Sequence, residues 1–100
     1  MKYNKLIRDN IPAIITNKGG NPITHVASDE EYEQKLLEKL AEEVSEFQEA
    51  KSVEEMADIK EVLLAIYDLY GFKKEEVEKV RQEKKEERGG FSERIILEES

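Results

Sequence analysis

The stretch from Ser28 to Gly71, SDEEYEQKLLEKLAEEVSEFQEAKSVEEMADIKEVLLAIYDLYG, decides the fold of this chain. In its first half, apolar residues recur at the spacing of one helical face, at Leu36, Leu37, Leu40, Val44 and Phe47. This pattern predicts a long amphipathic helix that runs from Ser28 to about Ala50.

Two serines mark where the helices of this stretch begin. Ser28 is followed by Glu31, and Ser52 is followed by Glu55, which is the spacing of a helix-capping box. Gly71 suits the left-handed position that follows a helix end. A second long helix is therefore expected from Ser52 to Gly71. Because the connection is only a few residues long, the two helices should lie antiparallel as a hairpin.

The second helix is apolar around most of its circumference. Its apolar residues are Val53, Met56, Ala57, Ile59, Val62, Leu63, Leu64, Ile66, Tyr67, Leu69 and Tyr70. A helix of this kind is buried on more than one side. One neighbouring helix in a chain of 100 residues cannot cover it, so we expect at least a homodimer, or a homotetramer.

Shorter elements flank the hairpin. A short helix is expected, with Asp9 or Asn10 as its cap and Pro12 in its first turn. Ile11, Ile14 and Ile15 would share one face, and Gly19 and Gly20 would end the helix. A third long helix is expected from Lys73 to Arg88.

Two β-prone runs, residues 22–27 and 93–98, could pair with each other, although a two-stranded ribbon alone is marginal. The expected fold is thus all-α, a single domain over residues 1–100. It consists of a helical hairpin and further helices in an oligomeric bundle, with two β-prone segments.

Composition narrows the possible functions. The net charge of −8 disfavours a nucleic-acid polymer as a partner. There is no cysteine for disulfides or thiolate metal sites. No apolar run approaches the roughly 20 residues of a membrane span, and the basic start lacks the apolar run of a signal peptide. We therefore expect a cytoplasmic protein without a membrane segment.

Paired carboxylates on the first long helix are the first candidates for chemistry. Glu43 and Glu46 are three residues apart and so are neighbours on the helix surface. Glu43 lies near the edge of the apolar face, with Glu46 further round. A solvated helix flank is an alternative interpretation of this pair. Glu42 and Glu49 point away from the apolar face and are expected to be solvent residues.

A second pair, Glu55 and Asp58, lies on the facing helix. Glu55 projects inside the apolar arc, where an ionised carboxylate is costly without compensation. It could fold back onto the Ser52 amide, or the two pairs could converge across the hairpin. Four converging carboxylates would repel one another and need a cation between them. Oxygen ligands alone favour a hard ion, Mg²⁺ or Mn²⁺.

The third long helix supplies positive charge. Its apolar line through Val77 and Val80 continues to Lys84 and Arg88, which could bind phosphate or could simply cover the edge of the core. The single histidine, His25, is expected to be structural. The aromatic residues are expected to belong to the core rather than to stack on a base, namely Phe47, Tyr67, Tyr70 and Phe91.

These motifs resemble those of a known enzyme family. Glu42-Glu43-x-x-Glu46 followed by Glu55-x-x-Asp58 is similar to the acidic signature of the MazG-like all-α nucleoside triphosphate pyrophosphohydrolases. The 84–88 segment resembles the later basic motif of that family, with Lys85 where asparagine is usual. The 5–12 segment, KLIRDNIP, and the 88–91 segment, RGGF, are familiar from its short single-domain branch, often labelled phosphoribosyl-ATP pyrophosphohydrolase-like.

The resemblance implies Mg²⁺-dependent cleavage between the α and β phosphates of a nucleotide, within a homo-oligomer. Glu43, Glu46, Glu55 and Asp58 would hold the metal, and one of them would accept the proton of the attacking water. Lys84 and Arg88 would bind the phosphates. Two alternatives stay open: a non-enzymatic helical regulatory or scaffold module, and the phosphoribosyl-ATP pyrophosphohydrolase of histidine biosynthesis.

Overall fold

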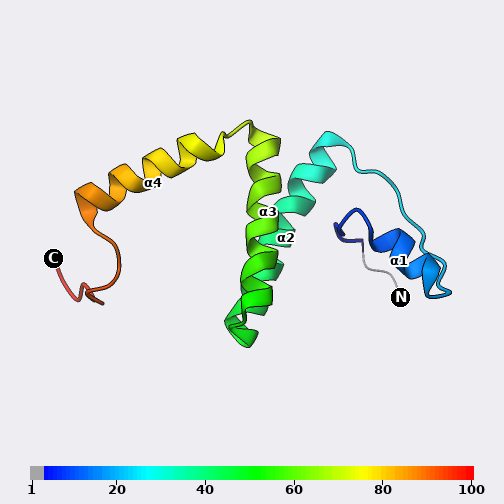
Figure 1. Ribbon diagram of the computed structural model, residues 1–100, viewed down its shortest axis with the longest axis horizontal. Coiled ribbons are helices and arrows are strands. Elements are labelled where there is room, and N and C mark those ends of the chain that lie inside the picture. Colours follow the sequence, from blue (N-terminus) through cyan, green and yellow to red (C-terminus); the bar gives the residue numbers. More distant parts are fainter. Residues whose placement is uncertain (1–3) are drawn as a thin grey trace.

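The computed structural model describes residues 4–100, so the first three residues of the expected domain lie outside it. The described chain is all-α (Figure 1). Its four helices are α1 (Ile11–Asn17), α2 (Asp29–Ala50), α3 (Val53–Tyr70) and α4 (Lys74–Arg88). No helix among the described residues is both long enough and apolar enough to cross a membrane.

The caps of the hairpin form as predicted. The hydroxyl of Ser28 accepts a hydrogen bond from the Glu31 amide at 3.3 Å, and that of Ser52 accepts one from the Glu55 amide at the same distance. These bonds satisfy amides that have no partner within the helix. Gly71 follows α3 with a positive φ of 72°, as expected for a glycine that ends a helix. The antiparallel hairpin is confirmed.

The core lies between α2 and α3, which are the helices that pack along their length. Its buried members are Leu36 of α2 and Val62 and Ile66 of α3. Partly buried residues surround them, namely Leu6, Tyr32, Leu40, Ala65 and Leu69. The apolar faces predicted for both helices therefore meet, and Leu6 adds the N-terminal segment to the same core.

Helix α4 forms where it was predicted but leads away from the hairpin (Figure 1). It contains no buried residue, and Val80 is 46% exposed. The radius of gyration is 17.9 Å, whereas a compact domain of this length has about 13 Å. Within one chain the helices thus form a hairpin with outlying helices, in an extended arrangement.

The short helix α1 also forms, with Pro12 in its first turn. Asn10 is its N-cap residue, but its side chain makes no capping hydrogen bond. Gly20 passes so close to Ile15 that an added Cβ would lie 2.6 Å from that side chain. Glycine therefore allows the chain to turn sharply after α1.

The two β-prone runs do not pair, and no strand forms in residues 4–100. Ile23 and Val26 are 95% and 97% exposed, and Ile95 and Ile96 are 79% and 82% exposed. The runs lie on opposite sides of the hairpin (Figure 1). A strand needs a partner for its backbone groups, and neither run has one within reach.

Candidate metal centre

The site is built around Glu43, a charged residue of α2 that the fold buries. Only 6% of Glu43 is exposed. It lies one heptad after the buried Leu36, on the face of α2 that meets α3. A carboxylate in this position loses most of its hydration and needs compensation from its neighbours.

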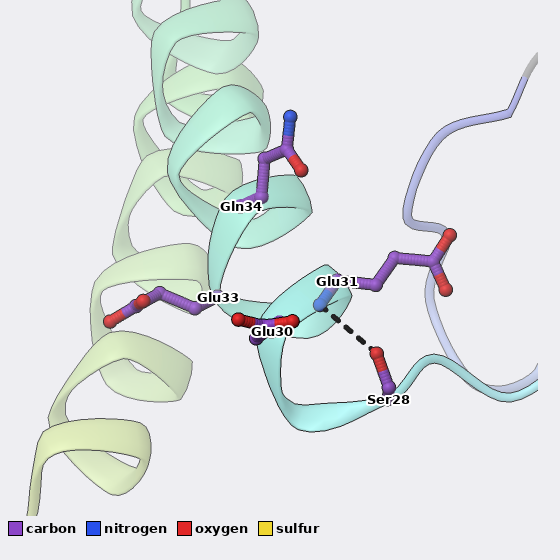
Figure 2. Close-up of a pocket in the computed structure, with 5 residues that line it drawn as sticks. All are labelled: Ser28, Glu30, Glu31, Glu33 and Gln34. Atoms are coloured by element: carbon purple, nitrogen blue, oxygen red, sulfur yellow. Dashed lines mark hydrogen bonds between the residues drawn. The ribbon is translucent and has the colours of Figure 1, made fainter.

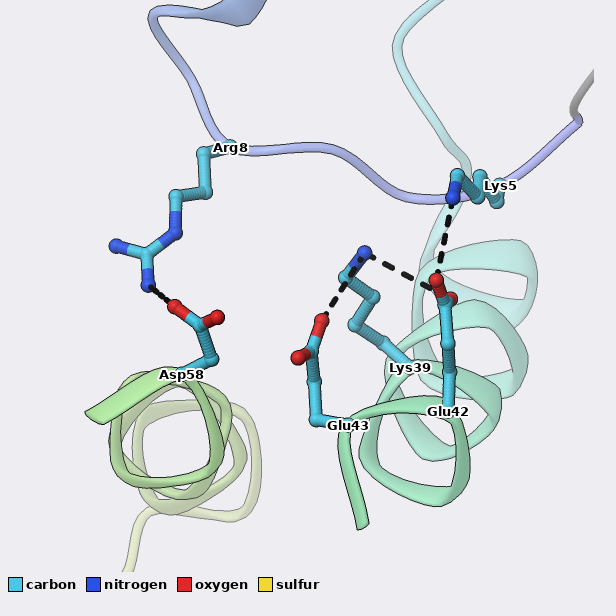
Figure 3. Close-up of polar contacts among 6 residues, drawn as sticks. All are labelled: Lys5, Arg8, Lys39, Glu42, Glu43 and Asp58. Atoms are coloured by element: carbon cyan, nitrogen blue, oxygen red, sulfur yellow. Dashed lines mark hydrogen bonds and ion pairs between the residues drawn. The ribbon is translucent and has the colours of Figure 1, made fainter. Parts of the chain in front are cut away.

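Helix α3 brings two more carboxylates to the same place. Glu55 and Asp58, one helical turn apart, are both partly buried. One carboxylate oxygen from each of Glu43, Glu55 and Asp58 lies within 4.8 Å of the other two. Figure 3 shows Glu43 and Asp58 projecting from neighbouring helices into the same space. The convergence expected across the hairpin thus occurs for these three residues, which we call the acidic cluster.

Glu46, the fourth predicted ligand, is exposed and lies outside the acidic cluster. At about 100° per residue, a position three residues after Glu43 is rotated by about 60° around the helix. That rotation takes Glu46 away from α3. It is still close enough for its charge to act on Glu43.

The surroundings of Glu43 disfavour the charged form of its carboxyl group. Burial raises the pKa of the Glu43 carboxyl, and the negative charges of Glu46 and Asp58 raise it further, against the opposing effect of Lys39. The Oε2 atoms of Glu43 and Glu55 are both buried and have no hydrogen-bond partner. Glu55 therefore does not resolve its burial through Oε2, and this oxygen remains available as a ligand.

Basic side chains surround the acidic cluster (Figure 3). Lys39 Nζ lies 3.4 Å from Glu43 and 3.7 Å from Glu42. Arg8 donates a hydrogen bond to Asp58 at 2.8 Å, and Lys5 donates one to Glu42 at 3.1 Å. The carboxylates of the site are therefore partly neutralised by cations from α2 and from the segment before α1.

Glu42 is not the ordinary solvent residue that its helical position suggested. Its side chain is 31% exposed and pairs with Lys5 and Lys39. Burial alone would raise its pKa, but hydrogen bonds and positive charge from the two lysines outweigh burial and lower the pKa. The N-terminal segment crosses this side of α2, and it covers a surface that periodicity assigned to solvent.

Lys5, Arg8 and Lys39 are site residues that the sequence reasoning missed. Lys39 could have been found, because it precedes Glu43 by four residues and so faces it on the helix. Arg8 and Asp58 are 50 residues apart in sequence. The only signal for Lys5 and Arg8 was the segment KLIRDNIP, which resembles a segment of the MazG-like branch. In this segment Leu6 and Ile7 lie between the two basic residues.

The predicted phosphate-binding residues lie elsewhere in the single chain. Lys84 and Arg88 are exposed on α4, which leads away from the hairpin. Arg81 on the same helix pairs with Glu78, with a bond of 2.9 Å from its Nε. The structure thus brings together Glu43, Glu55 and Asp58, and it does not bring Lys84 or Arg88 to them within one chain.

The aromatic residues divide between core and surface. Phe47 and Tyr67 are half-buried, as expected. Tyr70 is 41% exposed, and its hydroxyl donates to Glu33 at 2.8 Å. Phe91 is 97% exposed, so its assignment to the core is wrong. It follows α4, where the described chain offers no apolar surface to receive its ring.

A separate hollow lies at the start of α2 (Figure 2). It is lined by Ser28, Glu30, Glu31, Glu33 and Gln34. One of the lining residues, Glu31, lies 2.9 Å from Nε2 of His25, in keeping with a structural role for the histidine. Its lining is acidic and does not include the carboxylates of the acidic cluster, so it is a poor place for a phosphate.

The best-supported site is therefore the acidic cluster with its covering lysines and arginine. Two of its three carboxylates carry a buried oxygen without a partner, which is an arrangement suited to a cation. Comparison with known proteins finds no matching family model, no matching curated protein and no matching solved structure.

Proposed function

We propose that this protein is a Mg²⁺-dependent nucleotide pyrophosphohydrolase, which cleaves the bond between the α and β phosphates and releases a monophosphate and pyrophosphate. The observation that carries the proposal is the convergence of Glu43, Glu55 and Asp58, with buried oxygens that lack a partner. The resemblance of the acidic motifs to the MazG-like enzymes supports a nucleotide as the substrate class.

The residues present fit a divalent metal. Three carboxylates offer only oxygen ligands, which suits Mg²⁺ and also Mn²⁺. An ion about 2.1 Å from each ligand accepts oxygens up to about 4.2 Å apart. The oxygens of the acidic cluster lie within 4.8 Å of one another, so a small movement of the side chains would be enough.

Each side chain has a role in the proposed reaction. A bound Mg²⁺ would acidify a water molecule and neutralise charge on the phosphates. The acidic cluster would hold the ion. Glu46 is not part of the acidic cluster but lies next to it, and it would orient the water and take its proton. The water oxygen would form a bond to the α phosphorus as the bond from that phosphorus to the bridging oxygen breaks. Pyrophosphate then leaves with the electron pair of that bond.

A second copy of the chain completes the proposal. Apolar side chains of α3 and of the turn after it are exposed, with Val53 at 82%, Phe72 at 52% and Met56 at 47%. A homodimer or homotetramer would cover them. It would also allow α4 of one copy to bring Lys84 and Arg88 to the acidic cluster of another. A clean monomer mass in light scattering at micromolar concentration would contradict this assembly.

The activity is tested by measuring pyrophosphate release from a panel of nucleoside triphosphates, damaged nucleotides and phosphoribosyl-ATP, with and without Mg²⁺. Metal-dependent release that is lost in Glu55→Gln and kept in Glu49→Gln supports the proposal. Glu49 is the matched control because it is an exposed glutamate of α2. A preference for phosphoribosyl-ATP would identify the histidine-pathway alternative.

A non-enzymatic scaffold is the second candidate. It is favoured by the apolar side chains beyond α4, where Phe91 and Leu97 are 97% and 78% exposed and could serve as contacts for a partner. This function would be favoured over the enzymatic one if no member of the panel released pyrophosphate and if Mg²⁺ left the Tm of the protein unchanged.

A further inference from the structure

The segment before α1 folds back over the acidic cluster (Figure 3). In the described part of this segment, two basic side chains reach different helices: Lys5 contacts Glu42 of α2, and Arg8 contacts Asp58 of α3. Between them, Leu6 packs against the hydrophobic core. The apolar contact anchors the backbone, and the charged ends of Lys5 and Arg8 lie outside the core at the edge of the site.

The contact of Arg8 has a particular consequence, because Asp58 belongs to the acidic cluster. The guanidinium lies 2.8 Å from a carboxylate oxygen of Asp58, which is one of the three carboxylates that a divalent cation would use. The two side chains are 56% and 39% exposed. Ion pairs this exposed contribute little stability and exchange readily with other partners.

Arg8 does not satisfy the rest of the acidic cluster. Glu43 is 94% buried, being 6% exposed, and its Oε2 has no hydrogen-bond partner, as is also true of Glu55 Oε2. A cation that reaches all three carboxylates would therefore also neutralise Glu43 and Glu55, whose negative charges Arg8 does not compensate. Such a cation competes with Arg8 for Asp58 and would release the guanidinium beside the site.

We propose that Arg8 is a phosphate-binding residue that Asp58 holds until a divalent cation takes over that carboxylate. This inference rests on the proposed metal site and concerns how the substrate is held, through its phosphate chain. A guanidinium can donate two parallel hydrogen bonds to phosphate oxygens. Because Leu6 packs against the core and holds the backbone in place, the released guanidinium stays beside the acidic cluster.

The test is isothermal titration calorimetry on the full chain, first with Mg²⁺ and then with tripolyphosphate in saturating Mg²⁺. Arg8→Gln removes the competing charge, so Mg²⁺ should bind more tightly, by about 3- to 10-fold for one charge a few ångströms away. The same variant should bind tripolyphosphate roughly 10-fold more weakly or worse, because a charged hydrogen bond is lost. The affinity for Mg²⁺ should thus rise while the affinity for tripolyphosphate falls. A residue that only held the N-terminal segment in place would not produce changes of opposite sign.

Arg81→Gln is the matched control. Arg81 is also an arginine in an exposed ion pair, with Glu78, but it lies on α4. Both affinities should stay at the wild-type values. Arg8→Lys keeps the charge without the paired donors, so it should bind Mg²⁺ like the wild type and tripolyphosphate with intermediate affinity. If Arg8→Gln does not fold, a tripolyphosphate affinity of Arg8→Lys equal to wild type overturns the proposal.

The outcomes separate this inference from the proposed function. If the wild type binds no Mg²⁺, both the metal site and the role of Arg8 fail. If the wild type binds Mg²⁺ but Arg8→Gln binds Mg²⁺ and tripolyphosphate as the wild type does, the role of Arg8 fails and the metal site stands.

Discussion

The sequence predicts the helices of the α2–α3 hairpin and helix α4 equally clearly, yet the hairpin helices are packed in the fold and α4 is not. Helix α3 buries Val62 and Ile66 against α2, whereas α4 buries no residue. Both have a glycine after the last turn, and both form within a residue or two of the predicted bounds. Local signals are therefore sufficient to form a helix, but an apolar face with a matching partner is required to position it.

The carboxylates of the two regions show the same difference. Glu78 on α4 is 62% exposed, and a hydrogen bond from Arg81 lowers its pKa. Glu43 in the hairpin is buried, and burial together with neighbouring negative charge raises its pKa. The same residue type thus forms an ordinary surface ion pair in one region and a candidate ligand in the other, because the hairpin excludes water.

The largest expected difference in stability is between core and α4 substitutions. Leu36→Ala should lower the free energy of unfolding by about 2–5 kcal/mol, because it leaves a cavity in the only fully buried position of α2's apolar face. Val80→Ala should change it by about 0.5 kcal/mol or less, as for an exposed site. Denaturant unfolding measures both. A comparable loss in Val80→Ala would show that α4 is packed in solution.

The catalytic role of α4 is the next contrast. If Lys84 and Arg88 contact the phosphates in an oligomer, replacing either with Met should lower the rate about 10²–10³-fold, or about 2.7–4 kcal/mol. Lys74→Met is the control, since Lys74 is exposed at the other end of α4. Equal rates of pyrophosphate release in all three folded variants would contradict a phosphate-binding role for α4.

Metal binding should stabilise the hairpin by a smaller amount. At Mg²⁺ about ten times above Kd, linkage contributes about 1.4 kcal/mol to the free energy of unfolding. Glu55→Gln should remove most of the resulting rise in Tm, and Glu49→Gln should keep it. Equal rises in Tm in both variants and the wild type would contradict a specific site, because they would mean that Mg²⁺ acts on surface charge in general.

The smallest expected effect is the pH dependence that Glu43 contributes. Its pKa is raised in the folded state, so the folded protein binds this proton more tightly than the unfolded chain does. Stability should therefore fall as pH rises from the unfolded pKa of Glu43 to its folded pKa, and this loss is complete above the folded pKa.

Glu43→Gln removes that ionisation and tests its sign. In the absence of metal, Glu43→Gln should become more stable relative to the wild type as pH rises across this window. Glu78→Gln is the contrasting variant, because the pKa of Glu78 is lowered in the folded state. The charge of Glu78 stabilises the fold above the unfolded pKa of this residue, and the contribution is lost as pH falls through its folded pKa. Glu78→Gln lacks this contribution, so it should become less stable relative to the wild type as pH rises through that range. Urea unfolding at several pH values distinguishes the two trends.

Much of this protein is predictable from short stretches of its sequence. Ser28, Ser52 and Gly71 mark helix ends because capping involves only neighbouring residues. The spacing of Glu55 and Asp58 places them on one side of α3 for the same reason. All of these features depend on contacts within about one helical turn, which periodicity and caps describe directly.

The tertiary structure decided which of these residues meet. It buries Glu43 and leaves Glu46 exposed, because the line of contact between α2 and α3 depends on how Leu36, Val62 and Ile66 pack. It brings Arg8 to Asp58 across 50 positions of sequence, through an anchor at Leu6 that no periodicity indicates. It also leaves the two β-prone runs unpaired, because a strand depends on a partner at a distance, whereas a helix satisfies its own backbone.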